Sequence, residues 1–232
     1  MNKQELFQAI LKRCQEEFTP EVFEAIRTKK GNTQQAERIY ITIIRNILEE
    51  MKLSFTEAGS QQPYDFRIEM EDGEKLLLEA KKADTFSIYF NDTCPCKDGY
   101  YIVIFTGKRT KCVHTQVDAC VVGVNGQEFV KECPWVEDYA AELNQLKEKY
   151  RHMPGNMSVY PRPTFKSDIA FILEHEGKKL TNQRIDELKT EDQRVRDESK
   201  AEEKKEKKAK KEQEKVEKKK LVEERKEKNK LK

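Results

Sequence analysis

Residues 100–107, with the sequence YYIVIFTG, form a continuous apolar run that constrains the fold more than any other segment. A strand with one face in water alternates apolar and polar side chains, and because this run does not alternate, it predicts a strand buried on both faces. Such a strand needs a covering layer on each side of its sheet. Shorter runs rich in Leu, Ile, Val, Phe and Tyr, bounded by Gly, Asn, Asp and Pro, predict further strands over residues 53–57, 64–70, 75–82, 86–90 and 117–124.

Helices are expected before and after these strands. Apolar residues recur at helical spacing near the N-terminus, and Thr19 and Pro20 supply an N-cap and a first-turn proline for the second helix. The predicted helices cover residues 3–18, 20–28, 33–51 and 135–150, and residues 165–173 are expected to form a short strand or helix. Helices that pack on a mixed sheet favour an α/β sandwich.

The charged residues divide the chain into a body and a tail. Residues 200–232 contain 15 Lys, one Arg and nine Glu, a net charge of 16 − 9 = +7, which leaves 29 − 34 = −5 for residues 1–199. We therefore expect a globular domain over residues 1–180 and a charged tail over residues 181–232. Many Glu–Lys pairs in the tail lie three or four residues apart, so it is expected to be either a single solvated helix or disordered. A basic tail suits a polyanionic partner.

The six cysteines have no paired CxxC spacing. Cys94, Cys96 and Cys133 are weak candidates for a metal site, and reduced cysteines in a cytosol-like compartment are the simpler interpretation. The N-terminus has no secretory signal pattern, and no apolar run is long enough to span a membrane. We therefore expect an intracellular, cytoplasmic protein with no membrane partner.

Residues 76–82, LLLEAKK, raise a sharper question, because a buried strand here ends in one acid and two bases. The register of the hairpin that precedes it decides where Asp65 lies. A two-residue turn at Asp72–Gly73 would place Asp65 opposite Ala80, whereas a three-residue loop over residues 71–73, with Gly73 left-handed, would place it opposite Glu79. Glycine at the last loop position favours the second geometry.

This register predicts a cluster with a chemical use. Side chains two residues apart in a strand share a face, so Asp65, Glu79 and Lys81 would gather near the ends of adjacent strands. Two carboxylates at this separation repel unless a cation lies between them. Mg²⁺ accepts carboxylate oxygens while it keeps waters and phosphate oxygens. A lysine beside it can orient a water and stabilise charge on a phosphate.

Pro63-Tyr64-Asp65, followed after 13 residues by Glu79-Ala80-Lys81, resembles the signature of the PD-(D/E)xK nuclease superfamily. The tyrosine between the proline and the aspartate departs from the usual spacing. The order of helices and strands over residues 33–125 is similar to that superfamily's αβββαβ core. The amino-acid sequence around IYFNDTCP resembles type II restriction endonucleases, including those of large DNA viruses. The resemblance implies a restriction-endonuclease-like α/β sandwich, Mg²⁺ (with Mn²⁺ as a substitute) and cleavage of double-stranded DNA.

The resemblance also implies roles for particular residues. Asp65 and Glu79, with the Ala80 carbonyl, would hold the metal, and Lys81 would act on the attacking water. The family often adds an acid from the helix before the sheet, for which Glu37 is the candidate and Glu49 and Glu50 are competitors. Residues expected to approach DNA are Lys82, Ser87, Asn91 and Asp92 after the signature, and Lys108, Arg109 and Lys111 after the buried strand. An ordinary turn at 91–93 and a solvated basic loop explain these polar residues equally well.

The expected function is that of a Mg²⁺-dependent endodeoxyribonuclease of type II restriction kind. Cleavage of both strands at a symmetric site would require a homodimer. Two alternatives remain open: a repair or junction-resolving nuclease with the same chemistry, and a non-catalytic DNA-binding module that keeps the fold.

Overall fold

The computed structural model describes residues 1–28, 33–59, 64–91, 94–107, 117–155 and 164–230. The chain separates into two units, Met1–Thr110 with His114–Asn182, and a second unit from Gln183 to Lys232. The boundary expected from the charge pattern, at residue 180, falls two residues before this division. The candidate site lies within the first unit.

Three N-terminal helices form as their apolar spacing predicts: α1 (Lys3–Glu17), α2 (Pro20–Thr28) and α3 (Thr33–Glu50). Helix α1 begins with a capping box, in which Asn2 accepts from the Glu5 backbone N–H and the Glu5 side chain accepts from the Asn2 N–H. The stripes of α1 and α3 bury Ile10, Ile44 and Ile47, among others, against the sheet. The predicted helices over this part of the chain are confirmed.

The strands also follow the predicted runs. They are β1 (Phe55–Glu57), β2 (Phe66–Glu69), β3 (Lys75–Ala83), β4 (Ser87–Asn91), β5 (Gly99–Phe105), β6 (Cys120–Asn125) and β7 (Thr164–Asp168). Five of them form one mixed sheet in the order β1-β2-β3-β5-β6. The β3–β5 pair is parallel and the other pairs are antiparallel. Strand β3 is the middle strand, between β2 and β5. Strand β4 pairs instead with β7 in a separate two-stranded sheet. The α/β class with a mixed central sheet is therefore confirmed.

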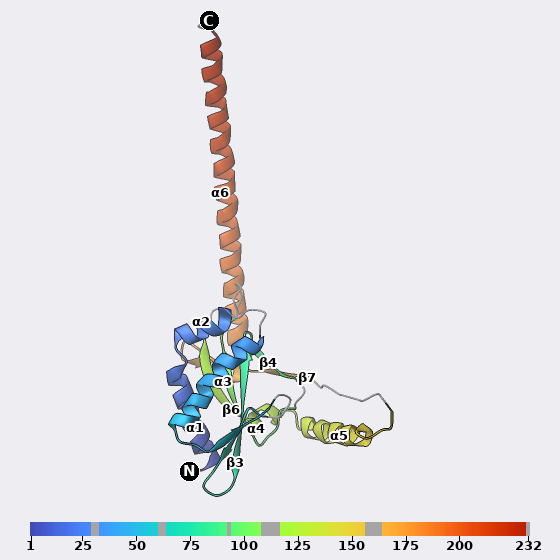
Figure 1. The fold of residues 1–232 in the computed structure, drawn as a ribbon. Coiled ribbons are helices and arrows are strands. Elements are labelled where there is room, and N and C mark those ends of the chain that lie inside the picture. The colour runs from blue at the N-terminus through green and yellow to red at the C-terminus, as the bar shows by residue number, and fades with distance from the viewer. Residues whose placement is uncertain (29–32, 60–63, 92–93, 108–116, 156–163, 231–232) are drawn as a thin grey trace. The chain divides into compact units, whose positions relative to one another are not determined.

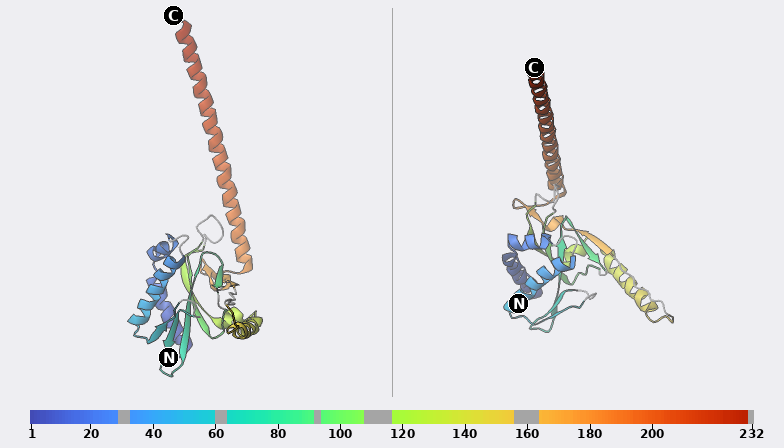
Figure 2. Two further views of the ribbon diagram at one scale, coloured as in Figure 1. Left: turned by 45° about the vertical axis from the view of Figure 1, so that its right-hand side comes forward. Right: turned by 45° about the horizontal axis from the view of Figure 1, so that its top comes forward.

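Both faces of the central sheet are covered, as the apolar run in β5 requires. On one face Ile102 and Ile104 join the core formed with α1, α2 and α3, which lie together on one side of the sheet in Figures 1 and 2. On the other face Tyr101 packs edge-to-face against Phe90 of β4 and Phe129 of α4 (Gly126–Val130). Farther along the same face, Phe105 stacks on Phe86. The prediction that β5 is buried on both faces is confirmed.

The connection between the parallel strands β3 and β5 differs from the family core that the sequence resembles. That core implies a helix between these strands, whereas the described residues of 84–98 contain strand β4. The run FSIYF explains the difference, because Phe86, Ile88 and Phe90 alternate with less buried residues and face the sheet.

The remaining elements are α5 (Trp135–Tyr150), the 3₁₀-helix η2 (Ala170–Ile172), the short hairpin β8 (Glu174–His175) with β9 (Lys178–Lys179), and α6 (Asn182–Lys230). The sequence predicted α5 but not α4, β8 or β9. The charged tail forms the helix α6, which confirms the helical alternative. Among the described residues, no helix combines the length and the apolar character needed to cross a membrane.

Candidate active site

The β2–β3 hairpin has the register that the glycine in its turn predicts. Its pairs include Phe66 with Leu78 and Glu69 with Lys75, the Met70 N–H donates to the Glu74 carbonyl, and Gly73 has φ = 81°. The turn is therefore the three-residue loop over residues 71–73, and the same register extended by one residue places Asp65 opposite Glu79. The Asp65 N–H donates to the Leu78 carbonyl at 3.0 Å, which ties this residue to β3 beyond the end of β2.

Asp65, Glu79 and Lys81 come together at the point where β2 ends beside β3. The Asp65 carboxylate accepts a hydrogen bond of 2.7 Å from the Ala80 N–H. The Lys81 ammonium lies 2.5 Å from a carboxylate oxygen of Glu79 and 5.1 Å from the centre of the Phe90 ring. These contacts restrain side chains that are largely buried, since Glu79 is only 7% exposed.

The electrostatics of this cluster favour a bound cation. Burial raises the pKa of Asp65 to about 6; the Ala80 N–H and the Lys81 ammonium oppose the rise, and the Glu79 and Glu37 carboxylates add to it. Two acids therefore lie near one ammonium ion in a partly buried cluster. A divalent cation between the carboxylates would offset both the burial and the repulsion.

Asp65→Asn is expected to stabilise the metal-free protein above pH 6. The raised pKa means that the fold disfavours the Asp65 carboxylate, so the contribution of this group to stability is fully present below pH 3.8 and is lost as the pH rises through about 6. The loss amounts to at most about 3 kcal/mol, and asparagine avoids it while its side-chain oxygen still accepts from Ala80. Urea unfolding in EDTA from pH 4 to 8 measures the difference between variant and wild type. Asp72→Asn in the exposed turn is the control, and a difference independent of pH would contradict the prediction.

Three residues that the sequence did not single out as functional, Tyr64, Tyr101 and Gly99, support this cluster. Tyr64 has φ = 66°, an unusual value for a residue with a side chain, and this turn of the backbone sets the direction in which the chain enters Asp65. Tyr101 is fully buried beside Glu79 and accepts a 2.9 Å hydrogen bond from the Cys96 N–H. Gly99 lets both rings approach, because an added Cβ would lie 2.8 Å from Tyr64 Cε1. Only Gly99 leaves a sequence signal, since glycine at the start of an apolar strand marks a close approach.

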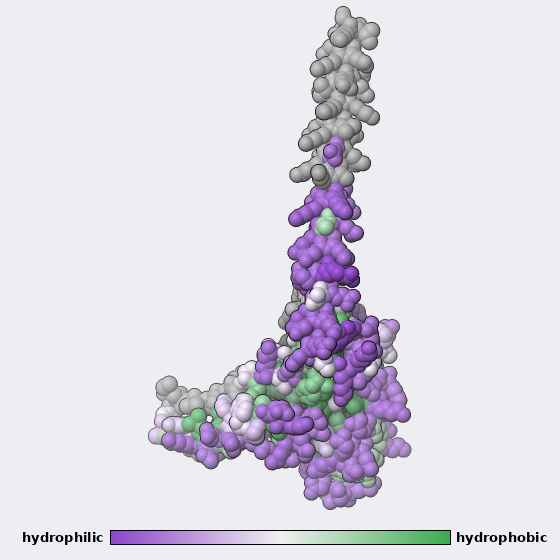
Figure 3. All heavy atoms as spheres, turned by 180° about the vertical axis from the view of Figure 1, so that it is seen from behind, coloured by the Kyte–Doolittle hydropathy of each residue, from purple (hydrophilic) through white to green (hydrophobic). Residues whose placement is uncertain are grey.

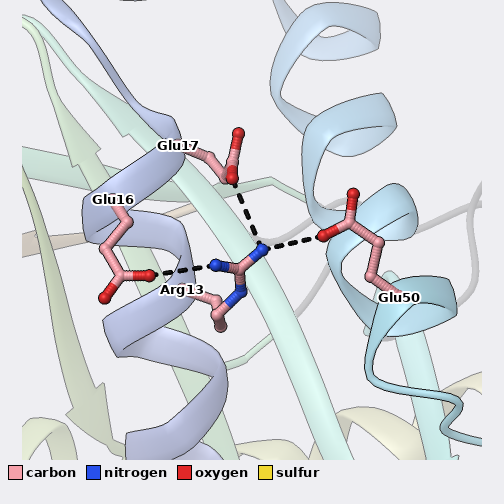
Figure 4. A network of polar contacts seen from close by, with 4 residues as sticks. All are labelled: Arg13, Glu16, Glu17 and Glu50. Carbon is pink, nitrogen blue, oxygen red and sulfur yellow. Dashed lines mark hydrogen bonds and ion pairs between the residues drawn. The ribbon is translucent and has the colours of Figure 1, made fainter.

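Glu37 lies near the cluster but does not complete a three-acid group. It is an exposed residue of α3, and its charge raises the pKa values of Asp65 and Tyr40. Within the described ranges, no three His, Cys, Asp or Glu side chains gather closely enough to hold a metal ion, and this applies to the described cysteines as well. Glu50, the alternative to Glu37 as a third acid, instead forms a 2.8 Å ion pair with Arg13 of α1 (Figure 4). The acids that the structure brings together in this candidate site are thus Asp65 and Glu79.

The residues expected to approach DNA are only partly described. Lys82 lies on the sheet face opposite Lys81 and forms a 2.7 Å ion pair with Asp84. Ser87 and Asn91 are the first and last residues of β4, which pair with β7. Asp92, Lys108, Arg109 and Lys111 lie outside the described residues.

Comparisons with protein-family models, curated proteins and solved structures find no match to this chain.

Proposed function

We propose that the chain is a Mg²⁺-dependent endodeoxyribonuclease with Asp65, Glu79 and Lys81 at its catalytic centre. The observation that carries the proposal is the hairpin register, which aligns two carboxylates from adjacent strands and places one lysine beside them. The same three residues carry the resemblance to PD-(D/E)xK nucleases, although a strand replaces the family's crossover helix between β3 and β5.

The donor set suits Mg²⁺. Carboxylate and carbonyl oxygens are hard ligands, and two acids leave most coordination positions for water and phosphate oxygens. The Ala80 N–H points toward Asp65, and because the N–H and C=O of one strand residue point to the same neighbour, its carbonyl is expected on that side as well. Asp65 and Glu79 would thus hold the ion with the Ala80 carbonyl. A bound Mg²⁺ would neutralise the phosphate and make a water more acidic.

Lys81 supplies the protein's own contribution to hydrolysis. Its ammonium lies beside the Glu79 carboxylate and over the Phe90 ring, and these two contacts restrict its position. There it would orient the attacking water and donate to a phosphate oxygen as negative charge develops. The water oxygen bonds to phosphorus, the bond from phosphorus to the 3′-oxygen breaks, and the leaving oxygen takes up a proton. The products are 5′-phosphate and 3′-hydroxyl ends.

The partner in this proposal is double-stranded DNA, and the location is wherever the chain meets DNA, in prokaryotic cytoplasm or in an infected cell. The net charge of +7 over residues 200–232 adds a sequence-independent attraction to phosphates that salt weakens. Site-specific cleavage of both strands would need two copies related by a two-fold axis.

Digestion of a plasmid of known sequence tests the proposal. Wild-type protein with Mg²⁺ is expected to cleave it, and EDTA is expected to remove the activity completely because the carboxylate pair then lacks its cation. Discrete fragments indicate a site-specific enzyme, and a smear indicates a nonspecific or structure-selective one. DNA binding without cleavage in Mg²⁺ or Mn²⁺ would replace the proposal by a non-catalytic binding module.

A further inference from the structure

Helix α5 leaves most of its surface outside the body of the first unit. Only Val136 is buried in it, and Trp135 and Tyr139 contact Phe165 of β7 at centroid distances of 6.1 and 5.2 Å. The ribbon shows α5 extending away from the central sheet (Figure 1). In the second half of α5, residues 143–150, every side chain is half-buried or exposed.

Large apolar side chains nevertheless line this helix. Trp135, Tyr139, Leu146 and Tyr150 are 54%, 41%, 46% and 37% exposed, and Leu143 between them is half-buried. Hydrophobic green atoms interrupt the purple surface along α5 in Figure 3. An exposed cluster of this kind on an otherwise charged helix is typical of an interaction surface.

The spacing of these residues fits a helical partner. Tyr139, Leu143, Leu146 and Tyr150 follow one another at intervals of four, three and four residues. This is the alternation of a coiled-coil seam, in which side chains of one helix insert between those of another. We call these four residues the α5 seam.

The charges beside the seam select a second copy of this chain in antiparallel orientation. Helix α5 has Glu137 and Asp138 in its first turn and Lys147 and Lys149 in its last turn. Two parallel copies would bring acids to acids and bases to bases, whereas two antiparallel copies bring each acidic end to a basic end. Glu137 already pairs with Lys97 at 3.2 Å in its own chain, and Asp138 is the second acid of that turn.

The flanking positions agree with this orientation. When Leu143 of one copy lies opposite Leu146 of the other, Glu142 comes next to Lys149 of the second copy, and the two-fold axis repeats the pair. We infer that the α5 seam is a homodimer interface in which two copies of α5 pack antiparallel. This inference depends only on the residues of α5 and is independent of the nuclease proposal. A single helix pair is small for an interface, so the association is expected to be in the micromolar range.

Sedimentation velocity of the full chain over a range of concentrations, without DNA or metal, tests the inference. Wild type is expected to show a monomer–dimer equilibrium. Leu146→Asp is expected to raise the dissociation constant by about tenfold or more, because it places a charge in the seam. Ala141→Asp adds the same charge on the exposed opposite side of α5 and is expected to leave the constant unchanged. Circular dichroism checks that both variants fold.

Charge reversal tests the orientation and the identity of the occupant. Glu142→Lys and Lys149→Glu are each expected to weaken the dimer by about threefold or more, and the double variant to restore it to within about twofold of wild type. Failure of the double variant to restore the dimer overturns the antiparallel pairing. A wild type that stays monomeric at all concentrations overturns the interface and leaves the seam to a different protein. Plasmid cleavage plays no part in these readouts, so either proposal can fail alone.

Discussion

Lys81→Met is expected to lower the rate of DNA cleavage by about a thousandfold or more, the scale of effect for a positioned acid–base or electrostatic group. Methionine keeps the length and apolar stem of lysine but removes the ammonium that lies against Glu79. The measurement is the initial rate of plasmid nicking in Mg²⁺.

The β2–β3 hairpin provides a matched control for this variant. Lys75 and Glu69 form a similar pair, 2.8 Å apart, at the turn end of the same two strands, where their side chains are 51% and 39% exposed. Lys75→Met removes a surface ion pair worth less than ~1 kcal/mol and is expected to leave cleavage unchanged.

Loss of the Lys81 ammonium also leaves Glu79 buried without its partner, which is destabilising in its own right. The double variant Glu79→Gln with Lys81→Met removes both charges and is expected to recover stability without activity. If the single variant keeps wild-type cleavage, Lys81 has no catalytic role.

Gly126→Ala is expected to destabilise the fold by more than ~3 kcal/mol or to prevent folding. A Cβ at this position would lie 1.7 Å from the backbone carbonyl oxygen of Cys96, and rigid backbone cannot move as a flexible side chain can. The same Cys96 backbone donates to Tyr101 and accepts from the Gly99 N–H, so any shift would spread to the support of the site.

Gly59→Ala is the control for this prediction. An added Cβ at Gly59 meets no atom within 4 Å, so the substitution is expected to be neutral or stabilising by up to about 1 kcal/mol. Urea unfolding of both variants measures the contrast. Equal stability of the two variants would show that α4 does not pack tightly against Cys96.

The part of the site that could be predicted is the part that rests on local rules. Gly73 determines the loop length, the loop length determines the register, and the register aligns Asp65 with Glu79. The buried strand β5 was equally predictable, because a continuous apolar run requires a layer on each side.

The remainder depends on tertiary contacts that leave little local signal. The positive φ of Tyr64 is unusual for a residue with a side chain and persists because the surrounding structure requires it. Phe90 lies under the Lys81 ammonium only because β4 occupies the crossover between parallel strands. Helix α4 and the β8–β9 hairpin are too short for periodicity to identify them.

Calorimetric titration of the full chain with Mg²⁺, and then with Mn²⁺, near pH 6 and without DNA tests most directly whether Asp65 and Glu79 share an ion. Wild type is expected to bind and to release a proton, because a cation displaces the proton that the raised pKa retains on Asp65. Asp65→Asn and Glu79→Gln are expected to lose affinity by about tenfold or more. Glu69→Gln at the far end of the hairpin is expected to match wild type. Equal binding by all four proteins, or no binding of either metal by wild type, would contradict a metal centre at these two carboxylates.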